Sequence, residues 1–138
     1  MKLVEGSNIE SFNSQPTLEG TTLKLRPLHV EDFDELYASS SNPKTWAGHP
    51  NSDRFQLPVF EKLFKASMES ESTLVVISRD ENKVIGSSRY YQVTPYPHDL
   101  CVGFTFLDCE YWGGKTNREL KGLMLGHAFT AVDTVWLH

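Results

Sequence analysis

A cationic turn with two glycines, at residues 113–118, is the stretch whose residue types best suit ligand-binding chemistry. Gly113 and Gly114 stand directly before Lys115, and Arg118 follows three residues later. Glycine lets a backbone turn sharply or approach a ligand closely, and the free amide groups at a helix start carry partial positive charge. This combination predicts an anion site of the kind that holds a pyrophosphate. The same residues also fit an ordinary strand-to-helix turn whose two cations face water.

The elements on either side of this turn must position it. Residues 100–108 alternate between two faces and predict a buried strand. One face carries Val102, Phe104 and Phe106, and the other carries Cys101, Gly103, Thr105 and Leu107. After the turn, apolar side chains recur at helical spacing as far as Ala131, and Thr116 with Glu119 forms a capping-box signature. We therefore expect a helix that begins at about Thr116.

Residues 114–116 also look like the end of a nucleotide-binding P-loop, whose pattern is G-x-x-x-x-G-K-[ST]. The first glycine of that pattern would stand at position 109, where the sequence has Cys109. The stretch also lies far along the chain rather than after its first strand. The pattern therefore does not predict a nucleoside triphosphatase.

The rest of the chain divides into short elements and loops. We expect a loosely held, polar N-terminal arm at residues 1–17 and a first strand at 18–28. A short helix should follow at 30–38, a loop at 39–58 and an amphipathic helix at 59–70. Strands are expected at 73–79 and 83–93, joined by a turn at Asp80-Glu81-Asn82, and a loop at 94–99. The last stretch, 134–138, predicts a fifth strand.

Bulk properties exclude several classes of protein. The chain has 138 residues, 39% of them hydrophobic, which suits a single domain with a core of its own. Its net charge of −5 argues against general affinity for nucleic acids or anionic membranes. No apolar run has the length of a membrane span and no secretory leader is visible, so the cytoplasm is the expected location. Cys101 and Cys109 lie too far apart on one strand to form a disulfide, and no cluster of metal ligands accompanies them.

Two further stretches carry a family resemblance. Tyr111-Trp112-Gly113-Gly114, followed by Asn117-Arg118-Glu119-Leu120, resembles the cofactor-binding segment of the GNAT superfamily of N-acetyltransferases. Residues 22–28, before an acidic helix start, resemble the opening of the branch that contains the ribosomal-protein alanine acetyltransferases. The chain departs from the family's Q/R-x-x-G-x-G/A motif, because Trp112 takes its first place, Lys115 a glycine place and Asn117 the last. Gly113 and Gly114 can still keep the amides of the turn exposed.

The resemblance implies a fold. It implies an α+β, α-β-α architecture, the GNAT (acyl-CoA N-acyltransferase) fold, in which helices flank a mixed, mostly antiparallel sheet. That domain would occupy residues 18–138 and be incomplete at its C-terminus, because the family fold continues into a further helix and two strands. The strand at 134–138 would then have an uncovered edge, open to pairing with a second copy of the chain.

The resemblance also implies a cofactor site and a reaction. Acetyl-CoA would be the acetyl donor, and a primary amine of a protein N-terminus or a small molecule would attack it directly in a ternary complex. The family motif places the donor on Phe106, Leu107, Trp112, Gly113, Gly114, Lys115, Thr116, Asn117 and Arg118. The alternatives are a non-catalytic GNAT-fold module that binds CoA or a partner, and an unrelated α/β ligand-binding domain.

The acceptor side is weaker in the sequence. Trp46 and His49 lie in the loop that forms one wall of the acceptor site in the family, and Tyr90 is a further candidate contact. Trp46 also fits a side chain that packs against its own domain. Many relatives carry a glutamate at the place of Cys101, so no catalytic residue is assigned. His98, Asp99 and His127 lie nearby, and each also fits an ordinary loop or packed residue.

Overall fold

The structure is a computed structural model that describes residues 12–49, 52–93 and 96–138. Within these residues, six strands form one sheet in the order β1-β2-β3-β4-β5-β6. The strands are β1 (Leu18–Glu19), β2 (Leu23–Pro27), β3 (Thr73–Ser78), β4 (Lys83–Val93), β5 (Tyr96–Leu107) and β6 (Val135–Leu137). The helices are α1 (Phe33–Ser40), α2 (Pro43–Trp46), α3 (Leu57–Ser70) and α4 (Lys115–Ala128), with 3-10 turns η2 (Val30–Asp32) and η3 (Cys109–Tyr111). Neighbouring strands are antiparallel except β5 and β6, which are parallel.

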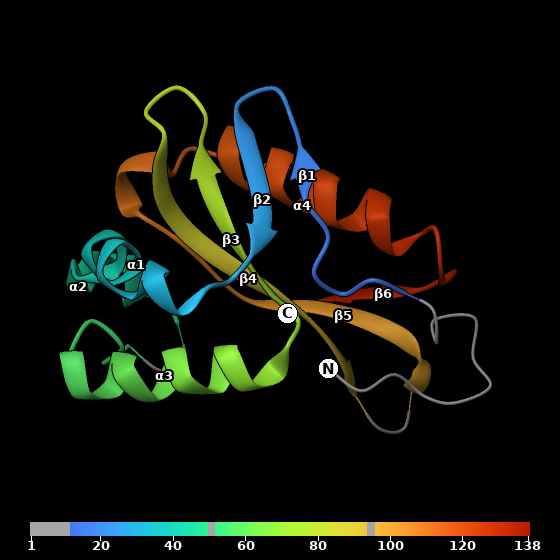
Figure 1. Ribbon diagram of the computed structural model, residues 1–138, viewed down its shortest axis with the longest axis horizontal. Coiled ribbons are helices and arrows are strands. Elements are labelled where there is room, and N and C mark those ends of the chain that lie inside the picture. The colour runs from blue at the N-terminus through green and yellow to red at the C-terminus, as the bar shows by residue number, and fades with distance from the viewer. Residues whose placement is uncertain (1–11, 50–51, 94–95) are drawn as a thin grey trace.

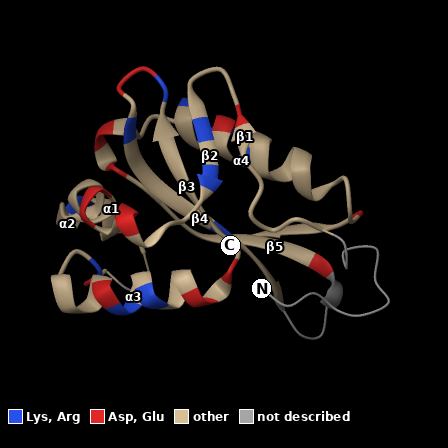
Figure 2. Ribbon diagram, viewed as in Figure 1, with Lys and Arg blue, Asp and Glu red and all other residues tan. Residues whose placement is uncertain are grey.

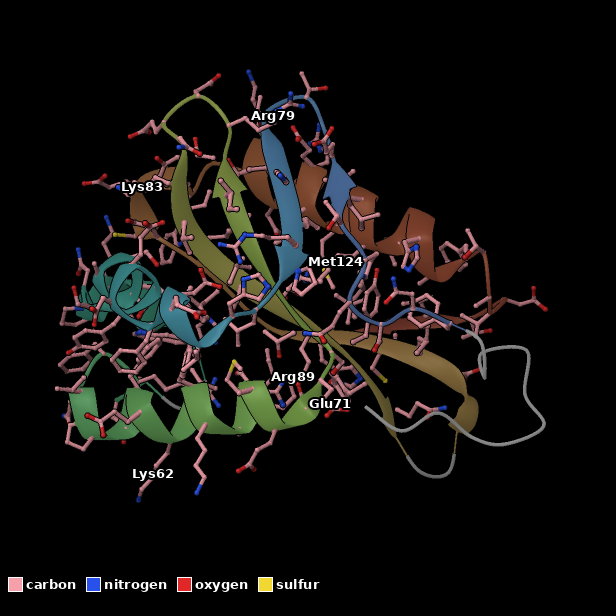
Figure 3. The ribbon with its side chains drawn as sticks, in the orientation of Figure 1. Lys62, Glu71, Arg79, Lys83, Arg89 and Met124 are labelled. Atoms are coloured by element: carbon pink, nitrogen blue, oxygen red, sulfur yellow. The ribbon has the colours of Figure 1, made fainter. Side chains whose placement is uncertain are left out.

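Helices cover both faces of the sheet (Figure 1). On one face α4 packs over a core that includes Leu25, Ile85 and Met124. On the other face α1, α2 and α3 enclose a second core around Trp46 and Phe106. Figure 3 shows the same division, with Met124 between α4 and the sheet and Arg89 between the sheet and α3. The two apolar faces explain why β3 is buried along almost its whole length.

A bulge in β5 overturns the predicted alternation of that strand. Ser87 pairs with Phe106 and Arg89 with Gly103, so two residues of β5 stand opposite the single residue Ser88. Phe104 accommodates the bulge with a φ of 53°. The inserted residue reverses the side-chain direction, so Val102 and Phe106 contribute to opposite cores. Phe104 belongs to neither core and is 42% exposed.

Most of the other predicted elements are confirmed, with shifted ends. The strand at 83–93 has the predicted bounds, and α3 begins two residues before the predicted 59. The single strand predicted at 18–28 is wrong, because the chain turns at Gly20, whose amide donates to the Leu23 carbonyl, and forms the hairpin of β1 and β2. The loop predicted at 39–58 contains α2. β5 begins at Tyr96, inside the predicted loop 94–99, of which 94 and 95 lie outside the described residues.

The predicted N-terminal arm is described only in part, since residues 1–11 lie outside the described residues. From Phe12 onward the segment packs on the domain. The Phe12 ring meets the Tyr90 ring edge to face at 5.2 Å, and the Gln15 side chain donates to the Thr73 carbonyl at 3.0 Å. Residues 12–17 therefore extend the core on the α4 face of the sheet.

The surface matches the modest net charge. Figure 2 shows basic and acidic residues interspersed along α3, while the charged residues of α1 are acidic. No helix in the described part of the chain is long and apolar enough to cross a membrane.

Candidate functional site

The turn between β5 and α4 is built by glycine and by a tryptophan. Gly113 and Gly114 have φ angles of 131° and 97°, in the left-handed region that favours glycine. Gly114 is the N-cap of α4, and its carbonyl accepts the Arg118 amide at 2.9 Å. The Trp112 indole donates to the Leu107 carbonyl at 3.0 Å and holds the turn against the end of β5. The first turn of α4 therefore presents its free amides beside β5.

A cavity of about 330 Å³, which we call the turn pocket, opens at this point. It is lined by Thr45, His49, Thr105, Phe106, Leu107, Tyr111, Trp112, Gly113, Gly114 and Asn117. Six of the nine predicted cofactor-binding residues are thus brought to one cavity. The other three, Lys115, Thr116 and Arg118, belong to the first turn of α4, and both cations among them are exposed. The turn pocket joins the end of β5 to the N-terminus of α4.

A second cavity, the middle pocket, adjoins the turn pocket through His49 and Thr105, which line both. Its volume is about 410 Å³. Its lining residues are Gly48, His49, Arg54, Tyr91, Phe104, Thr105 and His138. The pKa of His49 lies below its usual value, because burial and then the positive charge of Arg54 disfavour the imidazolium. A neutral imidazole between two cavities can accept a proton.

A third cavity, the arginine pocket, adjoins the middle pocket through Arg54 and Phe104. Its volume is about 500 Å³. It is lined by Asp53, Arg54, Val59, Lys62, Leu63, Ala66, Arg89 and Phe104. The bulge in β5 creates this connection, because it turns the Phe104 ring out of both cores and under the Arg89 guanidinium, 4.0 Å from the ring centre. The three cavities form one row.

Thr105 anchors a polar network beside the row. Its hydroxyl lies 2.7 Å from the Ser88 hydroxyl and accepts a hydrogen bond from the Lys121 ammonium at 2.7 Å. Burial lowers the pKa of Lys121 to about 8, since the partly buried ammonium group loses some of its hydration. Sequence reasoning missed Lys121, because a lone lysine on an amphipathic helix carries no signal of its burial.

Two predicted acceptor contacts lie in the cores instead. Trp46 is fully buried, with its indole donating to the Ser40 carbonyl at 2.8 Å, which is the packed alternative considered above. Tyr90 is also fully buried, and its hydroxyl donates to the Met124 carbonyl at 2.6 Å. A side chain without exposed surface cannot touch an acceptor, so the assignment of both to the substrate site is wrong. The neighbour Tyr91 points to the opposite face and lines the middle pocket.

The predicted capping box is wrong as well. The N-cap of α4 is Gly114, two residues before Thr116. The Glu119 carboxylate instead accepts hydrogen bonds from Thr22 and from the Leu23 amide. The signature misled because a capping box and a long-range carboxylate contact need the same residue type at the same position.

The residues considered as a general base have other partners. Asp99 accepts a hydrogen bond from the Trp136 indole at 2.9 Å. The His127 ring lies 4.7 Å from the Phe12 ring and is tilted to it by 36°, and its Nε2 lies 2.7 Å from the Asn13 carbonyl oxygen. Burial, and then the charge of Asp99, raise the pKa of the Cys101 thiol. The side chain of His98 lies outside the described residues.

Comparison with known proteins gives one consistent fold. A GCN5-related N-acetyltransferase from Brucella melitensis is similar to this chain, with 22% identity, a TM-score of 0.67 and coverage of 86% of this chain and 56% of that one. A GNAT-family acetyltransferase from Bacillus anthracis aligns with 16% identity, a TM-score of 0.70 and coverages of 83% and 67%. The ribosomal-protein-S5-alanine acetyltransferase from Vibrio fischeri aligns with 21% identity, a TM-score of 0.60 and coverages of 84% and 68%. No protein of curated function matches the chain.

These likenesses confirm the fold expected from the resemblance, a mixed sheet flanked by helices on both faces. The chain spans between 56% and 68% of the length of these three structures. The family model described as "Acetyltransferase (GNAT) domain" matches residues 22–138, which is most of the sequence. The match includes the turn, the bulged strand and the helix α4. The chain therefore belongs to the GNAT acetyltransferase family.

Proposed function

We propose that the chain binds acetyl-CoA in the turn pocket and transfers the acetyl group to a primary amine. The observation that carries this proposal is the single cavity that joins Phe106 and Leu107, at the end of β5, to Gly113 and Gly114, at the start of α4. A thioester with a pyrophosphate-bearing arm requires this pairing of an apolar strand end with exposed helix amides. The exposed cations Lys115 and Arg118 add positive charge at the same end.

Three parts of the chain would act in the reaction: the start of α4, a backbone amide of β5, and His49. The free amides of the first turn of α4, with Lys115 and Arg118, bind the pyrophosphate. Acetyl-CoA supplies an activated thioester, and a backbone amide of β5 polarises its carbonyl so that the amine attacks directly. His49, at the boundary of the turn and middle pockets, takes the proton that the attacking amine loses. The nitrogen–carbon bond forms as the carbon–sulfur bond breaks.

Calorimetric titration of acetyl-CoA into the purified chain tests the binding step. We expect saturable binding near one equivalent, and the absence of binding by the folded chain would contradict the proposal. The mass in solution should be measured alongside, because Trp136 and Leu137 on β6 are 42% and 55% exposed and offer an apolar edge for a second copy.

A non-catalytic, CoA-binding module is the second candidate. It is favoured by Cys101, which is buried and stands at the place where the family resemblance implies a glutamate. Transfer of acetyl groups to a panel of small amines and of peptides with N-terminal alanine or serine separates the two. Binding of acetyl-CoA without transfer to any acceptor would favour the module.

A further inference from the structure

Two arginines, Arg54 and Arg89, lie together at the far end of the row of pockets. Both line the arginine pocket, one from the segment after α2 and the other from β4. The pKa of Arg89 lies below its usual value, because of burial and then because of repulsion by Arg54. Burial also lowers the pKa of Arg54, although Asp53 partly opposes it. The two guanidinium groups therefore lie together in the arginine pocket, partly removed from water.

Neither arginine forms a salt bridge with a carboxylate in the described part of the chain, although Asp53 also lines the pocket and its charge acts on Arg54. The salt bridge found in the described residues joins Arg26 to Asp32, and neither of these residues lines the arginine pocket. Arg89 instead donates to the Ser67 hydroxyl at 3.0 Å and stacks over Phe104, and its buried Nε has no hydrogen-bond partner among the residues that the structure describes. Arg54 lies over the Trp46 ring at 5.7 Å.

This arrangement is costly unless an anion completes it. Burying a charged group without a partner is unfavourable, and an unpaired buried donor adds a further cost. Guanidinium groups present forked donors that match the oxygens of a carboxylate or a phosphate. Aromatic rings hold both groups in place while leaving those donors available. Lys62 also lines the pocket, but its side chain points away from the sheet (Figure 3), so the two arginines form the anion site.

The position of the pair relative to the other pockets indicates what the anion belongs to. The turn pocket meets the middle pocket at His49 and Thr105, and the middle pocket meets the arginine pocket at Arg54 and Phe104. A small molecule in the middle pocket would thus have one end beside the proposed acetyl donor and the other beside the arginines.

We propose that Arg54 and Arg89 bind the carboxylate or phosphate of a small amine acceptor whose amino group is presented at His49 and Thr105. This inference rests on the proposed function, which places the acetyl donor in the turn pocket. It narrows the acceptor to small amines that carry an anionic group. The chain as a whole is negatively charged, but the two arginines make this pocket locally positive.

Direct binding, measured by calorimetry without acetyl-CoA, tests the site. The probes are ω-amino acids of increasing length and phosphoethanolamine, each compared with a partner that keeps the amine but lacks the anionic group, the ω-amino amide or ethanolamine. We expect at least one amine with an anionic group to bind tenfold or more tightly than the partner without it. Preference for the amino acids or for phosphoethanolamine identifies the anion as a carboxylate or a phosphate.

Matched variants locate the binding. Arg89→Gln and Arg54→Gln should each weaken binding of the anionic amine about tenfold, because each removes one charged donor fork. Lys65→Gln, on the exposed face of α3 and outside all three pockets, should leave it within twofold. Arg54→Gln keeps the test decisive where Arg89→Gln fails to fold, since Arg54 makes no hydrogen bond with the described residues that an anion would have to replace.

Two results would overturn the inference. One is equal binding of amines with and without the anionic group, and the other is unchanged binding of the anionic amine in both arginine variants. These results are separate from the fate of the proposed function. Failure to bind acetyl-CoA contradicts the donor site alone, whereas the acceptor titration is performed without the donor and reports on the arginines alone.

Discussion

The Glu119 carboxylate on α4 binds Thr22 at the start of β2, accepting hydrogen bonds from its hydroxyl at 2.8 Å and its amide at 2.9 Å. The same carboxylate accepts the Leu23 amide at 2.8 Å. Residues almost one hundred positions apart are thereby joined, and the helix that begins at the proposed pyrophosphate site is fixed to the β1–β2 hairpin. The contact links the stability of the fold to the position of the turn pocket.

Glu119→Gln should destabilise the domain by about 1–2 kcal/mol, because charge-assisted hydrogen bonds are replaced by weaker ones. Desolvation opposes ionisation, but the hydrogen bonds from Thr22 and Leu23 and the charge of Arg79 lower the pKa of Glu119 overall. A carboxyl whose pKa is lower in the folded state stabilises above its unfolded pKa and loses that contribution as the pH falls through the folded value. Urea denaturation of both proteins at pH 7 and at pH 3 measures this, and a gap of equal size at both pH values would contradict it.

Gly114→Glu should abolish binding of acetyl-CoA, because a carboxylate would stand where the pyrophosphate is proposed to bind. Apart from the residue itself and its two chain neighbours, no atom of the described residues lies within 4 Å of a Cβ built at this position, so the side chain has room. The positive φ costs any substituted residue about 1–2 kcal/mol. Gly114→Gln is the matched control, since it has the same strain and nearly the same shape without the charge. Equal calorimetric affinities of the two variants would refute the placement of the pyrophosphate.

Tyr90→Phe should lower the free energy of unfolding by about 1 kcal/mol, because the Met124 carbonyl loses its buried hydrogen-bond donor. Affinity for an anionic amine should not change, since Tyr90 touches no pocket in the row. Tyr91→Ala removes a ring from the middle pocket and should alter that affinity. Thermal unfolding and calorimetry of both variants test the assignment, which would be wrong if Tyr90→Phe alone changed binding.

His49→Gln should reduce the rate of acetyl transfer about 10²-fold, the lower range for general base catalysis, while acetyl-CoA binding stays intact. The pKa of His49 is lowered by burial and by Arg54, so the wild-type pH profile should contain an inflection below about 6.5, separate from the one that the amine acceptor contributes at higher pH. The variant should lack this inflection. A pH profile of kcat/KM decides, and an unchanged inflection in the variant would assign the base elsewhere.

Lys121→Met should stabilise the domain at neutral pH by about 1–2 kcal/mol. Converting the whole lowering of the pKa at about 1.4 kcal/mol per pKa unit would give a larger value, but the ammonium is partly exposed and water screens its charge. Burial lowers the pKa of Lys121 from 10.5 to about 8, so between these values the unfolded chain binds more protons than the folded one. The stability of the wild type relative to the variant should therefore rise from pH 8 to pH 10.5 and be constant below pH 8. Denaturation curves across this range measure the difference, and a constant difference would contradict the shift.

The elements and the turn were predictable from sequence, because they depend on local patterns. Apolar periodicity located α3, β4 and α4, and two adjacent glycines marked residues 113–114 as a place of unusual backbone geometry. The family resemblance added acetyl-CoA, a thioester, as the expected ligand of that turn. The wrong predictions came from local patterns that fit two different structures. Thr116 and Glu119 have the spacing of a capping box, yet the carboxylate finds better partners on a strand distant in sequence.

The sequence by itself determined where helices and strands form and which turn suits an anion, since backbone propensity and side-chain period act over a few residues. Only the tertiary structure decided the bulge at Phe104, because an extra residue in one strand is defined by its pairing with another. The bulge in turn decided which residues line the pockets. Arg54 and Arg89 meet there because the segment before α3 lies over the face of the sheet to which the Arg89 side chain of β4 points, and no local pattern records contacts between segments so far apart along the chain.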